Sequence, residues 1–315
     1  DLWFLLVTIT GMTTLLVGAY LALFQHDLKG LLAYSTISHL GLITLLLGLD
    51  TDLATVAAIF HIINHAVFKA SLFMAAGIID HETGTRDITV LSGLRKVLLP
   101  VGIAAGLAAL SSAGVPLTFG FIGKDLIYES TLHAVPHLST ILTGLALVTN
   151  ICLLAAGFMA GFKPFFGELP EKYSKLHLPY LSMWLPPLIL GILCVLFGVF
   201  PGIVGDLLSY QTANAIFGQD TAMHLAIWHG FNTVLYLSIL TVVLGIVLLY
   251  FLKPTSKKQV GLILIQLPLM KQSNLVTALQ CLASVHKLNS LIPLQTSWLT
   301  QLANTFHHSS ARVQR

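Results

Sequence analysis

Long apolar runs alternate with short polar segments along most of this chain. A helix needs about 20 mostly apolar residues to cross roughly 30 Å of hydrocarbon. Runs of that kind occupy residues 2–24, 31–49, 53–79, 139–162, 183–204 and 231–252. The pattern predicts an all-α fold, that of a polytopic membrane protein.

Residues 101–135 form a seventh apolar region whose path is ambiguous. The region is long for one straight span and short for two spans joined by a loop. If it crosses once, ten basic residues in the loops share one side of the membrane: Lys29, Arg86, Arg95, Lys96, Lys163, Lys172, Lys175, Lys253, Lys257 and Lys258. Two crossings would distribute them over both faces, contrary to the positive-inside rule. We therefore expect about seven spans, one of them interrupted, with the basic loops cytoplasmic.

The interruption has a local cause in the segment from Ser111 to Pro116, followed by Gly120 and Gly123. Proline removes a backbone donor and glycine weakens a helix. Non-helical backbone at membrane depth is stable only where it faces protein or a water-filled cavity. We therefore expect this break to lie inside the helix bundle.

The two ends of the chain bear on where its membrane domain begins and ends. Residues 260–270 are too short to span, and residues 274–292 place leucines at helical spacing beside polar residues. This predicts a cytoplasmic or interfacial amphipathic tail over 253–315, after a transmembrane domain over 1–252. The chain starts apolar at once, without the basic region of a secretory signal, so we expect a fragment that begins in or near a span.

Composition excludes several other classes of protein. Hydrophobic residues make up 56% of the chain and charged residues 9%, against about a quarter charged in soluble domains. The net charge of +3 is small, and its bases lie in loops beside spans, which argues against nucleic-acid binding. Three cysteines without close spacing predict neither a disulfide framework nor a zinc site. No nucleotide-binding loop or nucleophile elbow is visible, and we expect no cofactor.

The most informative polar residues are His61, His65 and Lys69, which lie deep in the predicted span 53–79. Their spacing of four places them on one helical stripe about 12 Å long, with Asn64 beside it. An ionisable residue inside a membrane costs at least about 2.5 to 3.5 kcal/mol on insertion scales, so a line of three needs a compensating role. Histidine titrates near neutral pH, and a desolvated lysine releases its proton more readily. The stripe therefore predicts a proton relay.

Two other interpretations of this stripe stand beside the relay. Polar residues in spans often only make hydrogen bonds between helices. Histidines at positions i and i+4 can also share a metal ion. A metal site lacks a nearby carboxylate or cysteine, and Lys69 would repel the cation, so we expect no metal here.

Lys124 and Asp125 form a second candidate site, in the interrupted span. A helix break exposes half-helix ends that can hold ions at membrane depth. Alternatively, Lys124 is only neutralised by Asp125 or Glu129. Adjacent residues on a helix do not face each other, so Lys124 and Asp125 make a poor pair, while Glu129 is reached less directly.

A third set begins with Lys29, at the mouth of the span 31–49. A lysine there commonly snorkels to the interface and orients the span. Ser35 and His39 lie deeper and are four residues apart. They either add hydrogen-bonding steps to the stripe of His61, His65 and Lys69 or join helices.

These segments resemble one known family. The runs Gln25–Gly41, His61–Lys69 and Gly114–Asp125 look like motifs of the proton-conducting membrane subunits shared by respiratory complex I and Mrp-type sodium/proton antiporters. The motifs occur in family order within roughly residues 1–135. The run His224–Asn232 is similar to the A-type subunit of the Mrp antiporter in particular.

The resemblance implies roles for individual residues. Lys69 corresponds to a central proton-relay lysine, His61 and His65 to its polar neighbours, and Lys124 to the lysine on the broken helix. Leu117 stands where the family usually has a second proline. Family members also carry a buried Glu and Lys in upstream spans, so we expect this chain to hold only part of a pathway.

The resemblance also implies a function and its partners. We expect one subunit of a multi-subunit cation/proton antiporter in the bacterial plasma membrane, which conducts protons in exchange for Na⁺ together with other subunits. The alternatives are a proton-pumping membrane subunit of a complex I-like NADH-quinone oxidoreductase and a structural membrane subunit without an ion path.

Overall fold

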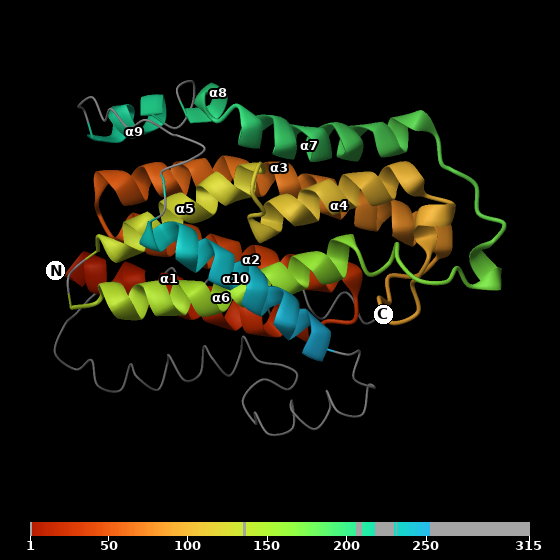
Figure 1. The fold of residues 1–315 in the computed structure, drawn as a ribbon, viewed down its shortest axis with the longest axis horizontal. Coiled ribbons are helices and arrows are strands. Elements are labelled where there is room, and N and C mark those ends of the chain that lie inside the picture. Colours follow the sequence, from red (N-terminus) through yellow and green to blue (C-terminus); the bar gives the residue numbers. More distant parts are fainter. Residues whose placement is uncertain (1, 135–136, 206–209, 218–229, 231, 253–315) are drawn as a thin grey trace, which may run out of the picture. The chain divides into compact units, whose positions relative to one another are not determined.

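The computed structural model describes residues 2–134, 137–205, 210–217, 230 and 232–252 (Figure 1). The regular elements of these residues are helices, apart from one isolated bridge between Asp27 and Asp87. The predicted all-α membrane fold is therefore confirmed for this part of the chain. The predicted tail 253–315 and most of the run His224–Asn232 lie outside the described residues.

Among the described residues, six helices are long and apolar enough to cross a membrane, and each matches a predicted span. They are α1 (Leu2–Leu23), α2 (Leu28–Gly48), α3 (Asp52–Thr83), α6 (Ser139–Gly161), α7 (Leu181–Val199) and α10 (Thr233–Phe251). The short elements are η1 (Leu94–Lys96), η2 (Glu171–Tyr173), α8 (Gly202–Val204) and α9 (Tyr210–Phe217). α7 ends five residues before the predicted span end at 204, because Phe200 precedes Pro201 and a residue before proline disfavours the helical conformation.

Local sequence explains where α2 and α3 begin. The Asp27 carboxylate caps α2 by accepting a hydrogen bond of 2.7 Å from the backbone N–H of Gly30. The Thr51 hydroxyl caps α3 in the same way, at 3.2 Å from the nitrogen of Ala54. Such caps satisfy donors that a helix start leaves free.

The region 101–135 folds as two helices, α4 (Leu99–Ala113) and α5 (Phe119–Leu132), so the expected break is present. α5 continues in the direction of α4 in Figure 1. Gly114 and Leu117 both have positive φ, 65° and 67°. A proline cannot adopt the φ of Leu117, so the backbone here differs from one with proline at this position. The number of membrane crossings stays a prediction.

Three loops meet at one end of the bundle (Figure 1). Backbone hydrogen bonds join the α1–α2 turn to residues 86–88, including Leu28 N–H to the Arg86 carbonyl at 2.9 Å. Others join residues 93–95 to 164–166, including Gly93 N–H to the Phe166 carbonyl at 3.1 Å. The loops that carry most of the basic residues therefore share one end, as the charge distribution requires. Their cytoplasmic location stays a prediction.

Candidate functional site

A polar row lies between α2 and α3. His39 Nδ1 of α2 is 3.0 Å from His61 Nε2 of α3, within hydrogen-bond distance. The ring centroid of His39 is also 4.9 Å from that of His65. His39 and His61 are buried, and His65 is partly buried. The structure thus brings His39 into the stripe of His61 and His65, so that the row joins two helices.

The packing of α1 against α2 holds one side of this row in place. A Cβ atom on Gly18 of α1 would lie 2.5 Å from the backbone nitrogen of Ser38. A Cβ atom on Gly41 of α2 would lie 2.4 Å from the nitrogen of Leu15. Small residues allow such close approach of helices in membranes. These contacts lie on both sides of His39 in the sequence of α2, and they fix the depth of His39 relative to α1.

The amine of Lys69 lies at the other end of the row and contacts α2. Its Nζ donates to the carbonyl oxygen of Leu32 at 3.2 Å and to the hydroxyl of Ser35. The Ser35 hydroxyl in turn donates to the Leu32 carbonyl at 2.9 Å. In the described part of the chain, no carboxylate forms an ion pair with Lys69. A buried amine is therefore held by neutral oxygens alone.

Four buried polar atoms of this region have no protein hydrogen-bond partner among the described residues. They are His39 Nε2, His61 Nδ1, Asn64 Oδ1 and His65 Nε2. Buried polar atoms nearly always have a partner, and a bound water fills that role where protein does not. The row therefore offers several points at which water molecules can connect its side chains.

Lys124 is built into the helix break. Its Nζ donates to the carbonyl oxygen of Ala113, the last residue of α4. A Cβ atom on Gly114 would lie 2.4 Å from Lys124 Cε, so in this position the lysine side chain packs directly against the glycine. The backbone nitrogen of Gly120 donates to the Ser111 hydroxyl at 3.1 Å, which ties α5 back to α4. Among the described residues, no ion pair joins Lys124 to Glu129.

Asn64 lies between these two sites. A Cβ atom on Gly123, the neighbour of Lys124, would lie 3.1 Å from Asn64 Nδ2. Asn64 therefore packs against α5, whereas His61 on the same helix contacts α2. The structure brings the row and the broken helix together at this asparagine.

Asp125 belongs to a different set of contacts, between α5, α6 and α10. Its Oδ1 accepts a hydrogen bond of 2.9 Å from the Ser238 hydroxyl. One turn along α5, the Tyr128 hydroxyl lies 2.6 Å from Thr241 Oγ1 and accepts from Asn150 Nδ2 at 3.2 Å. Sequence reasoning missed this cluster, because its five members are distributed over three separate helices. The spacing of three between Asp125 and Tyr128, and between Ser238 and Thr241, is the periodic signal that it did not use.

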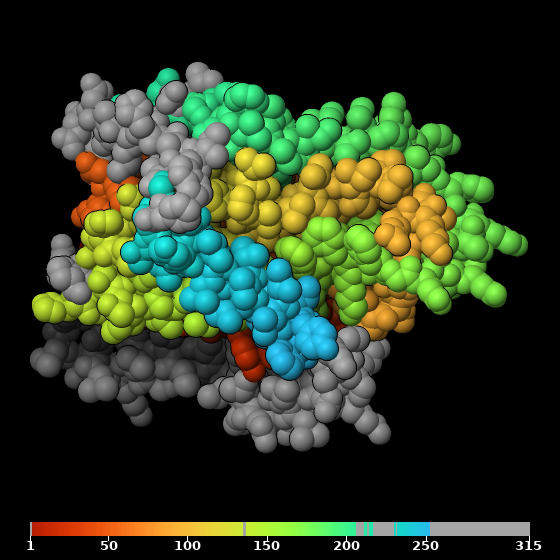
Figure 2. All heavy atoms as spheres, viewed as in Figure 1, coloured from red at the N-terminus to blue at the C-terminus, as the bar shows by residue number. Residues whose placement is uncertain are grey.

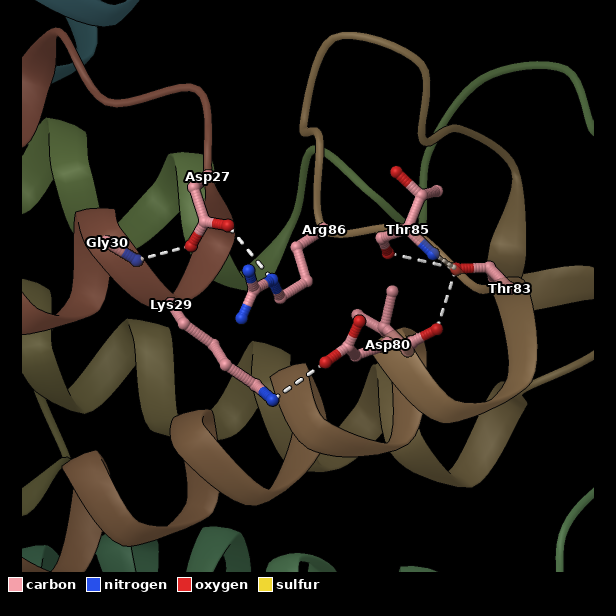
Figure 3. A network of polar contacts seen from close by, with 8 residues as sticks. Asp27, Lys29, Gly30, Asp80, Thr83, Thr85 and Arg86 are labelled. Carbon is pink, nitrogen blue, oxygen red and sulfur yellow. Dashed lines mark hydrogen bonds and ion pairs between the residues drawn. The ribbon is translucent and has the colours of Figure 1, made fainter. Parts of the chain in front are cut away.

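Lys29 lies at the loop end of α2, where Figure 3 shows an ion-pair network. Its Nζ is 2.8 Å from Asp80 Oδ2 at the end of α3, and Arg86 Nε is 2.9 Å from Asp27 Oδ2. The Lys29 side chain is 37% exposed. Lys29 is therefore separate from the buried row, and at six residues from Ser35 it points roughly 120° away from Ser35 around α2.

The fold and these buried polar residues define a multi-pass helical membrane protein with ionisable groups inside its bundle. Residues 2–151 match the family described as NADH:quinone oxidoreductase/Mrp antiporter, transmembrane. The chain belongs to this family of membrane subunits.

Two curated relatives of the chain are named as antiporter subunits. The chain is 44% identical over 256 residues to a protein of Rhizobium meliloti (strain 1021) named as a probable K(+)/H(+) antiporter subunit of type A/B, with 80% of this chain and 26% of the relative covered. It is 39% identical over 285 residues to the Na(+)/H(+) antiporter subunit of type A from Alkalihalophilus pseudofirmus, with 81% and 35% covered.

A solved structure of an Mrp complex also contains a chain similar to this one. The Mrp complex from Dietzia sp. DQ12-45-1b contains a chain that matches with a TM-score of 0.70 and 31% identity, over 99% of this chain and 34% of that chain. This chain thus spans between 26% and 35% of the length of these three relatives.

Proposed function

We propose that this chain is the proton-conducting part of the A-type subunit of a multi-subunit cation/proton antiporter in the bacterial plasma membrane. The observation that carries the proposal is the contact between His39 and His61, which joins two helices into one buried row that ends at Lys69. A merely structural set of polar residues would satisfy its own hydrogen bonds, whereas this row leaves several buried polar atoms without a protein partner among the described residues.

In this proposal, protons move along His61, His39 and His65 to Lys69 through intervening water. Asn64 connects the row to the broken helix, because its amide packs against the backbone beside Lys124. Lys124 then passes protons between the row and one face of the membrane. Ionisable groups at membrane depth commonly form such relays.

We further propose that the proton flow is exchanged for a monovalent cation, with Na⁺ as the first candidate. The resemblance to the A-type subunit of the Mrp antiporter supports Na⁺, as does the name of the Alkalihalophilus relative. The Rhizobium relative is named for K⁺, which makes K⁺ the second candidate. Other antiporter subunits are the expected partners, because similar chains are subunits of such complexes.

The test replaces single lysines in the full-length subunit within its complex. We expect Lys69→Ala and Lys124→Ala to abolish dissipation of a preformed pH gradient when NaCl or KCl is added to inverted membrane vesicles. Lys96→Ala is the matched control, since Lys96 is an exposed lysine outside the row. Immunoblots and co-purification of the other subunits check assembly.

Three outcomes separate the possibilities. Normal exchange by assembled Lys69→Ala and Lys124→Ala would reject the relay and leave a structural role. Loss of exchange in Lys96→Ala as well would mean that the assay reports surface charge. Co-purification of flavin and iron-sulfur subunits, rather than antiporter subunits, would assign the chain to a quinone oxidoreductase.

A further inference from the structure

A groove of about 360 Å³ lies on α4, away from the polar row. α4 forms one wall with Leu99, Gly106 and Leu110, and Phe162 and Phe166 at the end of α6 form the other. Figure 2 shows α4 in gold beside the C-terminal part of α6 in green. Apart from Arg95 at its end, the groove is lined by apolar side chains and glycine.

The length of the groove matches one leaflet of a membrane. Leu99 and Leu110 are eleven residues apart on the same face of α4, which corresponds to about 16 Å at about 1.5 Å per residue. Half of a hydrocarbon core of roughly 30 Å is about 15 Å. The groove thus runs from the loop end of the bundle to about the middle of the membrane.

The walls of the groove suit a single acyl chain. One wall is the side of α4 and the other is made by two phenylalanine side chains, and a single extended hydrocarbon chain fits between them.

Arg95 supplies a positive charge at the loop end of the groove. Its guanidinium carbon lies 4.9 Å from the centroid of the Phe166 ring, a cation–π contact, and its backbone N–H donates to the Phe165 carbonyl. In the part of the chain that the structure describes, no carboxylate forms an ion pair with Arg95. Arginine is well suited to phosphate, because its planar fork of donors matches the geometry of phosphate oxygens.

We propose that this groove binds one acyl chain of an anionic phospholipid, with the lipid phosphate at Arg95. The apolar walls match the acyl chain, the length matches one leaflet, and the arginine matches the headgroup charge. Nothing in this assignment depends on the proton path, so the site can exist whether or not the chain conducts protons.

The test measures lipid retained by the full-length subunit in its complex. Detergent-stripped complex is incubated with phosphatidylglycerol or phosphatidylcholine, and bound lipid is counted by native mass spectrometry. We expect Arg95→Gln to bind phosphatidylglycerol about fivefold more weakly, since a basic residue near the surface contributes about 1 kcal/mol to anionic lipid binding. Lys96→Gln is the control, because Lys96 is an exposed base next to Arg95 that does not line the groove.

A second variant tests the groove itself. In Gly106→Leu the new Cβ would lie 3.4 Å from Phe162, an ordinary contact, while the rest of the side chain fills the groove. We expect this variant to lose one bound lipid of either headgroup, and a photoreactive residue at Ile103 to crosslink to lipid.

Three results would overturn the proposal. Equal retention of phosphatidylglycerol by wild type, Arg95→Gln and Gly106→Leu would show that no lipid occupies the groove. A crosslink from position 103 to protein instead of lipid would show that another polypeptide segment covers it. A uniform loss in all variants, Lys96→Gln included, would assign binding to general surface charge and would also reject the site.

Discussion

Gly114→Ala tests how the helix break positions Lys124. The added methyl group would lie 2.4 Å from Lys124 Cε, whereas ordinary contact begins near 3.4 Å. The lysine side chain must therefore shift by about 1 Å, which is enough to spoil its hydrogen bond to Ala113. A hydrogen bond to a charged group contributes about 1.5–3 kcal/mol. If transport depends on that position, its rate falls by roughly 10- to 100-fold.

Gly114 also has a φ of 65°, so part of the effect of alanine is backbone strain. Gly84, at the end of α3, provides the matched control, since its φ is 69° and nothing lies within 4 Å of its Cβ position. In both variants an alanine in the left-handed backbone conformation lowers the free energy of unfolding by about 1 kcal/mol. Only Gly114→Ala displaces a lysine.

The measurement is the initial rate of Na⁺- or K⁺-dependent proton movement in vesicles, normalised to assembled complex. Thermal unfolding of the purified complex is recorded for both variants. We expect similar unfolding temperatures and a transport defect in Gly114→Ala alone. Equal transport by the two variants would show that the position of the Lys124 amine at Ala113 is irrelevant to conduction.

Three further substitutions follow from the same contacts. Gly120→Ala should prevent assembly, seen as loss of this subunit from the purified complex, because its Cβ would lie 1.6 Å from the Ser111 carbonyl oxygen and overpacking costs about 1–3 kcal/mol or more. Ser35→Ala removes one of the oxygens that hold the Lys69 amine, and we expect proton transport in vesicles to fall about tenfold, with Ser35→Thr recovering part of it. Tyr128→Phe loses two hydrogen bonds between helices and should lower the free energy of unfolding by about 1–3 kcal/mol, with transport less affected than unfolding temperature.

Hydropathy and spacing are sufficient to predict the helices and part of the candidate site. Six spans follow from apolar length alone, because a membrane imposes one minimum length on every crossing. The stripe of His61, His65 and Lys69 follows from the helical repeat within one element. The break before α5 follows from the glycine and proline content of a single segment.

Contacts between helices lie beyond what the sequence predicts. Ser35 and His39 are equally compatible in sequence with extending the stripe and with joining helices. Their positions depend on how α2 packs against its neighbours, through backbone contacts such as that of Gly18 in α1 with Ser38. The sequence relates Asp125 only to the neighbouring lysine, yet the structure places its carboxylate against Ser238 of α10. A hydrogen bond between residues 113 positions apart leaves no periodic signal in the sequence.

The two buried lysines are held by the same kind of contact, which bears on why lysine stands at these positions. Lys69 donates to the carbonyl of Leu32 and Lys124 to that of Ala113, and neither has an ion-pair partner among the described residues. A carboxylate partner would strongly favour the charged amine and hold its proton in place. A carbonyl oxygen only accepts hydrogen bonds, and an amine can donate one whether it is charged or neutral. Either protonation state therefore keeps the same contact, so the proton can leave and return with little rearrangement of the helices. A proton relay requires that property, whereas an ion pair that only stabilises the packing of helices has no need of it.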